Sequence, residues 1–191
     1  SCSHIGDGGT TYFLPLNPGG QKTYSTTENT CCHGTGLESR FRYMGQIYAE
    51  DADYHYVNLL VDSKVETEDW SMSLRYKDDG RLCISTETGS KKGLKIHIPG
   101  WAEGRYTLKV NGVVDNSPAN ALVGGFLTLA GPIPADTQID IELPMELRIL
   151  NNPSDEKLVN VAFGPTVLAA LHEQEGFLSA PKKLVRDGDG F

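Results

Sequence analysis

The chain has 191 residues and a hydrophobic fraction of 39%, enough for a sizeable buried core. Its formal net charge at pH 7 is -8, which argues against nucleic acid as a partner, because phosphate binding needs a basic surface. No apolar run approaches the roughly 20 residues of a membrane-spanning helix, so we expect no membrane partner. A neutral, polar partner such as a sugar is compatible with this charge and composition.

The first thirty residues are rich in glycine, threonine and asparagine, and they predict an irregular loop. Pro15 and Pro18 interrupt any regular element after residue 14. Long irregular loops often form binding surfaces. Tyr12 and Tyr24 lie in this loop, and we expect both to contact a substrate.

The loop leads into Cys31, Cys32 and His33, followed by Gly34-Thr35-Gly36. Residues 36–49 have apolar side chains at helical spacing, such as Leu37, Phe41 and Met44, and predict a helix. The two thiols therefore precede a helix N-terminus, where the helix dipole favours a thiolate and lowers the cysteine pKa.

From residue 54 onward the period of the apolar residues changes to two, which predicts strands. The predicted strands cover residues 54–61, 70–76, 94–98, 106–110, 127–129, 139–143, 147–149 and 159–163. Turn residues separate most of them, and Asn111-Gly112 is a strong signal for a tight hairpin turn. Several short strands with regular turns predict a mainly β protein, a jelly-roll-like β-sandwich.

The four cysteines, at positions 2, 31, 32 and 83, do not have the spacing of a secreted disulfide scaffold. Between the two locations, we expect the parent protein in the cytoplasm rather than secreted. Cys83 lies in the strand-like segment 81–85 and is predicted to be a small buried hydrophobic residue. The chain begins without methionine, and we expect it to be part of a longer protein.

The adjacent thiols of Cys31 and Cys32 have three interpretations. They are a buried or disulfide-bonded structural pair, two ligands of a zinc site, or a redox pair acting with His33. Zinc binds thiolates readily but needs four ligands, and this segment has no second cluster at ligand spacing. Any complete zinc site must therefore take ligands from outside the chain or recruit His33 or Glu28.

Eight segments resemble, in matching order, the β-L-arabinofuranosidase family, glycoside hydrolase family 127, and its relatives. They are residues 12–19 (YFLPLNPG), 22–25 (KTYS), 31–38 (CCHGTGLE), 56–59 (YVNL), 97–102 (HIPGWA), 110–112 (VNG), 143–145 (LPM) and 163–165 (FGP). The resemblance extends to about residue 171. The segment with Cys31 and Cys32 and the Ile-Pro-Gly-Trp-Ala segment are fairly specific when they occur together.

The resemblance implies a bacterial parent with an (α/α)6 barrel followed by β-sandwich domains. Residues 1–50 would be the C-terminal remnant of the catalytic barrel, residues 51–171 the β-sandwich region, and residues 172–191 a polar tail or truncated linker. In that family the residue matching Cys31 is the nucleophile and a zinc ligand, and the residue matching Cys32 is a second zinc ligand. The parent would be a retaining glycosidase that binds Zn2+ and removes arabinofuranose or a related sugar from a glycan.

The family's other zinc ligands and its acid/base glutamate come from an earlier part of the barrel. We therefore expect the isolated chain to be inactive and to bind little or no zinc. Some members follow the cysteines with a run containing proline and asparagine instead of His-Gly-Thr-Gly, which places this chain in a different branch. An incomplete barrel helix exposes an apolar face, so we expect that the fragment can form a homodimer.

Two rival interpretations stay open. The first is a non-catalytic carbohydrate-binding or structural β-sandwich module. The second is a zinc- or redox-dependent module that uses Cys31, Cys32 and His33 without any sugar.

Overall fold

The computed structural model describes most of the chain between residues 38 and 168. The described residues are 20, 23, 24, 38, 39, 41–102, 104–116 and 122–168. Two compact units divide the chain, and Gln46–Leu168 forms the second of them by itself. Among the described residues, no helix has the length and apolar character needed to cross a bilayer.

The described residues of this second unit form thirteen strands. They are β1 (Tyr48–Glu50), β2 (Tyr54–Val57), β3 (Ser63–Glu66), β4 (Ser71–Tyr76), β5 (Arg81–Thr88), β6 (Gly93–His97), β7 (Thr107–Val110), β8 (Val113–Val114), β9 (Phe126–Leu129), β10 (Gln138–Glu142), β11 (Leu147–Asn152), β12 (Asp155–Phe163) and β13 (Thr166–Leu168).

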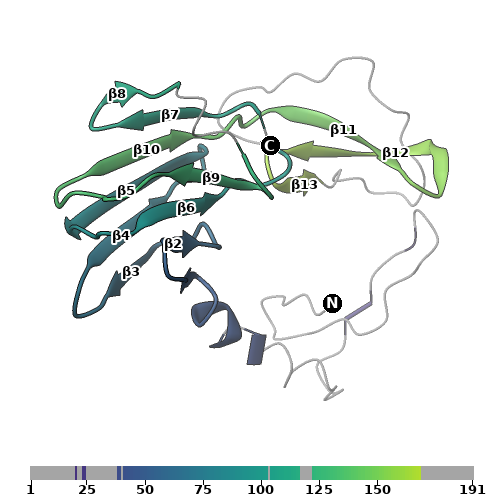
Figure 1. Ribbon diagram of the computed structural model, residues 1–191. Coiled ribbons are helices and arrows are strands. Elements are labelled where there is room, and N and C mark those ends of the chain that lie inside the picture. The colour runs from purple at the N-terminus through teal and green to yellow at the C-terminus, as the bar shows by residue number, and fades with distance from the viewer. Residues whose placement is uncertain are drawn as a thin grey trace. The chain divides into compact units, whose positions relative to one another are not determined.

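Two sheets face each other and form the sandwich (Figure 1). One has the strand order β1-β2-β6-β9, and the other has the order β3-β4-β5-β10-β7-β8. The pairing of β2 with β6 is parallel, and the other pairings in these sheets are antiparallel. The mainly β, sandwich-type architecture predicted from the sequence is confirmed.

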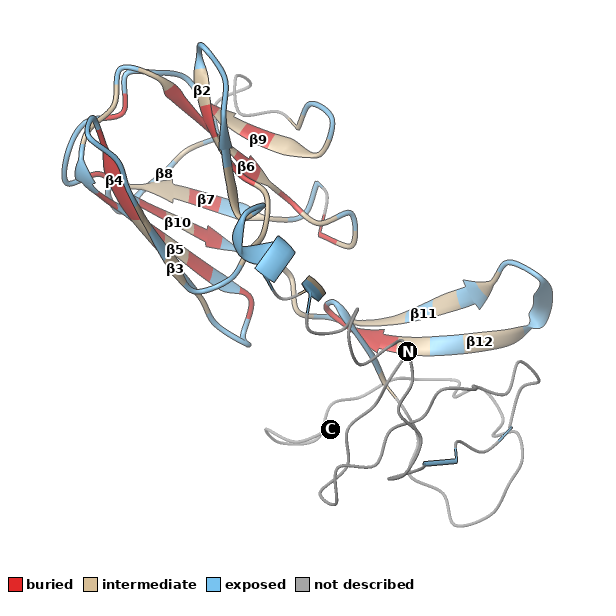
Figure 2. Ribbon diagram, turned by 90° about the horizontal axis from the view of Figure 1, so that it is seen from below, coloured by how far each residue is buried: buried red, intermediate tan, exposed pale blue. Residues whose placement is uncertain are grey.

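The core lies between the two sheets, and along several strands buried residues alternate with more exposed ones (Figure 2). From the smaller sheet it takes residues such as Val57, Ile96 and Leu127, each 0% exposed. From the larger sheet it takes residues such as Leu74 and Ile139, also 0% exposed. The apolar alternation in the sequence therefore marks the face of each strand that becomes buried.

Strands β11, β12 and β13 form a separate antiparallel sheet. Ala162 and Phe163 are buried, whereas Ile149 and Val167 are exposed. The register shifts between Asn151 and Asn152. This sheet lies outside the buried cluster of the sandwich.

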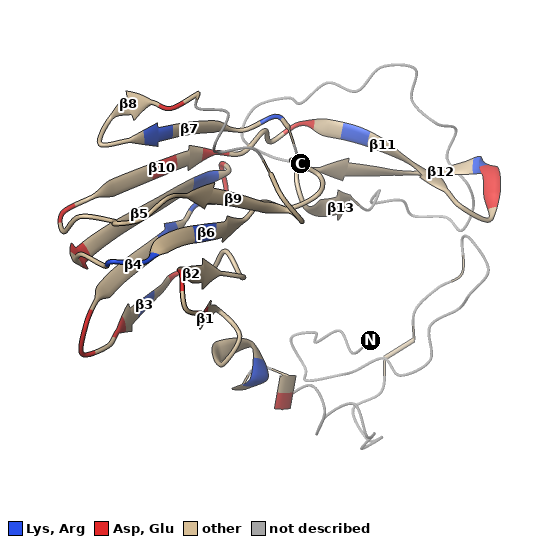
Figure 3. Cartoon of the chain, in the orientation of Figure 1, with Lys and Arg blue, Asp and Glu red and all other residues tan. Residues whose placement is uncertain are grey.

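Charged residues of both signs are scattered over the strands and turns of the sandwich (Figure 3). Lys64 pairs with Glu87 across 2.9 Å, and Lys109 pairs with Glu142 at the same distance. Exposed pairs of this kind contribute little to stability, so the buried apolar cluster dominates the stability of this unit.

Two local predictions are wrong. The predicted helix over residues 36–49 ends early: residues 38–39 and 41–44 are helical, Gly45 follows, and Tyr48 begins β1. Phe41 and Met44 are exposed, at 75% and 70%.

Cys83 is half-buried instead of buried, because it lies on the opposite face of β5 from Leu82 and Ile84. Burial and its neighbour Asp140 raise the pKa of its thiol.

Candidate functional site

Most of the residues that the sequence singles out lie outside the described part of the chain. Cys31, Cys32, His33 and Tyr12 all fall there, so their assignments stay predictions. Tyr24 is described and is 41% exposed. Among the described residues, no group of three or more His, Cys, Asp or Glu side chains is placed to hold a metal ion.

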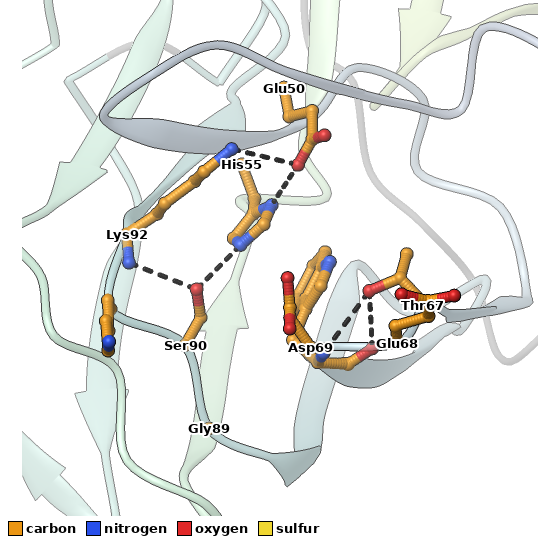
Figure 4. Close-up of a pocket in the computed structure, with 10 residues that line it drawn as sticks. Glu50, His55, Thr67, Glu68, Asp69, Gly89, Ser90 and Lys92 are labelled. Carbon is orange, nitrogen blue, oxygen red and sulfur yellow. Dashed lines mark hydrogen bonds and ion pairs between the residues drawn. The ribbon is translucent and has the colours of Figure 1, made fainter.

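A cleft in the described part of the chain has a volume of about 590 Å³ (Figure 4). Three segments line it: the β1–β2 region with Glu50 and His55, the turn 67–70 before β4, and the loop 89–92 between β5 and β6. Glu50, His55, Ser90 and Lys92 lie on one side, and the turn 67–70 lies across from them. Its volume falls in the range of about 300–1,000 Å³ typical of small-molecule sites.

A buried histidine holds one side of the cleft together. His55 is 4% exposed, and its Nε2 lies 2.7 Å from Ser90 Oγ. Ser90 Oγ also accepts the backbone N–H of Lys92 at 3.1 Å, which leaves the serine hydroxyl hydrogen for the imidazole. The other ring nitrogen, Nδ1, lies 3.4 Å from Glu50 Oε2.

Lys92 links this network to the start of β2. Its Nζ donates to Glu50 Oε2 at 3.1 Å and to the backbone carbonyl of Asp51 at 2.7 Å. The carboxylate of Asp51 accepts from Tyr56 and from the backbone N–H groups of Asp53 and Tyr54, and these bonds lower its pKa to about 2.

Trp70 forms the floor beside the histidine. Its ring stacks on the His55 ring with 3.8 Å between centroids and 17° between planes. Trp70 is 6% exposed, so its ring packs in the core of the sandwich. Burial, and then the nearby Lys92 charge, lower the pKa of His55, while Glu50 acts in the opposite direction. The imidazole therefore stays neutral near pH 7 and serves as a hydrogen-bonding group.

The order Glu50–His55–Ser90 has the chemical sequence of an acid–base–nucleophile triad. Two contacts argue for a structural role instead. Ser90 Oγ accepts Lys92 N–H and closes its own loop, and the exposed Glu50 carboxylate is shared between His55 and Lys92. We therefore interpret this network as a clamp that joins the β1–β2 region to loop 89–92.

Sequence reasoning did not find this cleft. His55 occupies a core-facing position of a strand where the alternation leads one to expect an apolar residue, and this is the signal that was available. No motif or periodicity in the sequence marks Ser90 or Lys92 as members of a site. They reach His55 because β6 pairs with β2 in parallel, a pairing between residues far apart in the sequence.

Much of the domain around this cleft is similar to a known family model. Residues 55–145 match the family model described as "Beta-L-arabinofuranosidase, GH127 middle domain". No curated protein matches the chain.

Three solved structures are similar to it. A GH127 β-L-arabinofuranosidase from Geobacillus stearothermophilus T6 shares 23% identity, with a TM-score of 0.60 over 75% of this chain and 24% of its own. A structure titled glycoside hydrolase shares 19% identity, with a TM-score of 0.65 over 82% of this chain and 27% of its own. A second GH127 β-arabinofuranosidase shares 23% identity, with a TM-score of 0.71 over 84% of this chain and 29% of its own.

The chain thus spans about a quarter of the length of these structures. The sandwich fold is common to all of them, and the family model adds the sequence evidence. Residues 55–145 are therefore similar to the middle domain of glycoside hydrolase family 127, and the resemblance predicted from the sequence is confirmed.

Proposed function

We propose that this chain is the C-terminal part of a retaining glycoside hydrolase of the β-L-arabinofuranosidase type. One observation carries the proposal: residues 55–145 match the GH127 middle-domain model, and the Cys31-Cys32 segment precedes this range in the same chain. A glycosidase of this family implies a carbohydrate substrate for the parent. The chain would supply one wall of the active site, with the rest coming from the remaining three quarters of the protein.

In the proposed reaction, the thiolate of Cys31 attacks the anomeric carbon of the arabinofuranosyl residue, and the bond to the leaving oxygen breaks. The sugar is then attached to the sulfur of Cys31. Water attacks the same carbon, releases the thiolate and restores the original anomeric configuration. Most retaining glycosidases use a carboxylate as nucleophile, so a cysteine in this role is a specific, testable feature.

The two adjacent thiolates fit a zinc ion by donor type, because zinc binds cysteine sulfur readily. Cys31 and Cys32 would hold it together with ligands from the part of the protein that precedes this chain. When bound, zinc keeps the thiol deprotonated at neutral pH. Tyr12, Tyr24 and His33 would contact the sugar.

The test measures zinc content and p-nitrophenyl arabinofuranoside hydrolysis in the full-length parent, for the wild type and for Cys31→Ser. Cys83→Ser is the matched control, because Cys83 lies on the sandwich and carries no proposed role. We expect one zinc per wild-type protein, loss of activity in Cys31→Ser, and an active Cys83→Ser variant.

Loss of metal must be separated from loss of the nucleophile. Mass spectrometry of the wild type after brief exposure to a slow substrate should find the glycosyl adduct on the peptide that contains Cys31. Unchanged activity in Cys31→Ser would remove Cys31 from the mechanism. A wild type without activity or zinc would favour the alternative, a non-catalytic carbohydrate-binding or structural β-sandwich module.

A further inference from the structure

We propose that the cleft between the turn 67–70 and the loop 89–92 binds a neutral sugar through adjacent free hydroxyl groups. This inference goes beyond the proposed function and does not depend on Cys31 chemistry. It rests on three observations. Charged side chains line the cleft, only some of them are bonded to other protein groups, and hydrogen bonds hold both segments in place.

The polar groups around the cleft fall into two sets. Glu50, His55, Ser90 and Lys92 are bonded to one another. Glu68, Asp69 and Lys91 line the same cleft and are exposed, yet their side chains make no hydrogen bond or ion pair with any described residue.

These three side chains suit a sugar diol. A carboxylate accepts hydrogen bonds from two neighbouring hydroxyls, and an ammonium group donates to a hydroxyl or ring oxygen. Hydrogen bonds to charged groups are also stronger than bonds between neutral groups.

The segment that carries the two acids is held in place before any ligand arrives. Thr67 and Trp70 close the turn by three bonds, from Thr67 N and Oγ1 to the Trp70 carbonyl and from Trp70 N to Thr67 Oγ1, at 2.9, 3.1 and 3.2 Å. The stacking of Trp70 on His55 fixes the base of this turn. A turn already ordered loses less conformational entropy on binding.

The segment that carries Lys91 is equally constrained. Ser90 exchanges both backbone hydrogen bonds with Ile133, each at 2.8 Å, and its hydroxyl bonds to His55. Lys91 is therefore displayed between two anchored residues, Ser90 and Lys92.

Other ligand classes fit the cleft less well. A metal ion would need a set of ligands that the described part of the chain does not offer. An anion such as phosphate would meet Glu68 and Asp69, while Lys92 is already committed to Glu50 and Asp51. Three carboxylates against two lysines give the lining a slight negative balance, which also disfavours an acidic sugar.

The test is a titration of the 191-residue chain, labelled with ¹⁵N, with the methyl glycosides of L-arabinose, D-xylose and D-galactose. D-glucuronic acid serves as the charged comparison. We expect saturable shifts of the amide signals of residues 67–70 and 89–92 with at least one neutral sugar, and weaker binding of the uronic acid.

The double variant Glu68→Gln with Asp69→Asn keeps the size of both side chains and removes their charge. We expect it to weaken binding about ten-fold, and Lys91→Gln to weaken it by a similar factor. The matched control, Glu156→Gln with Lys157→Gln, changes exposed charges on β12 and should stay within about two-fold. No saturable binding of any neutral sugar, or equal binding by the double variant, would overturn the proposal.

Discussion

At the scale of single residues, the bond between His55 and Ser90 is the contact whose loss should cost most in this cleft. Ser90→Ala leaves Nε2 of a histidine that is 4% exposed without its partner at 2.7 Å. Since an unsatisfied buried polar group costs about 1–3 kcal/mol, we expect a fall of that size in the free energy of unfolding. Urea denaturation followed by tryptophan fluorescence measures it. Ser85→Ala, on an exposed position of β5, should change stability by less than about 0.5 kcal/mol, and an equal loss in both variants would contradict the idea.

The same histidine predicts a pH dependence. Burial and then Lys92 lower the pKa of His55 below its ordinary value of 6.5, although Glu50 acts against this. The unfolded chain therefore takes up a proton before the folded chain does, and stability falls as the pH drops below about 6.5. Asp51, with a pKa of about 2, stays ionised in this range. We expect His55→Gln to lose less unfolding free energy than the wild type between pH 7 and pH 5, and equal losses would show that His55 is not responsible.

At the scale of elements, the loop that connects β5 to β6 contains a glycine, Gly89, at a position where there is no room for a side chain. A Cβ at Gly89 would lie 2.6 Å from Ala135 N and 2.8 Å from Ile133 O, and both of these are backbone atoms. Gly89→Ala must therefore displace the backbone beside the Ser90–Ile133 bridge, and we expect a destabilisation of about 1–3 kcal/mol.

Gly100→Ala is the matched control for Gly89→Ala, because no heavy atom lies within 4 Å of the position that a Cβ at Gly100 would take. We expect it to be neutral or slightly stabilising, since alanine restricts the unfolded chain. Urea midpoints of the two variants make the comparison, and a Gly89→Ala variant as stable as Gly100→Ala would show that the loop adapts at no cost.

The elements also show what a sequence can and cannot predict. Strands such as β6 and β10 were predicted because Leu94, Ile96 and Ile139 alternate with polar residues and are buried. β1, β3, β8 and β13 were missed, because they are two to four residues long and bury little. The hairpin turn at Asn111-Gly112 was predicted correctly, with positive φ values of 49° and 79°.

The cleft could not be predicted in the same way, since its geometry depends on pairings between distant segments. Ser90 bonds to Ile133 and to His55, which lie 43 and 35 positions away. Local spacing carries no trace of such contacts. Conversely, Cys31 and Cys32 were singled out by residue type alone, which requires no knowledge of the fold.

At the scale of the whole molecule, the buried core of the sandwich belongs to a single unit of the chain. Its buried cluster extends from Val57 to Leu143, and all of it lies within the unit Gln46–Leu168. We expect residues 46–168, produced alone, to unfold in one cooperative transition, as single domains of this size usually do. Both tryptophans, Trp70 and Trp101, lie in this segment and report the transition by fluorescence.

The isolated unit also separates the two proposed sites. It lacks Cys31 and Cys32 but retains Glu68, Asp69 and Lys91, so it should bind no zinc through the cysteine pair and still bind a neutral sugar. A chelator should leave its urea midpoint unchanged. A broad, non-cooperative transition would mean that the residues outside this unit contribute to its stability, because the buried cluster by itself would then be insufficient to hold the two sheets together.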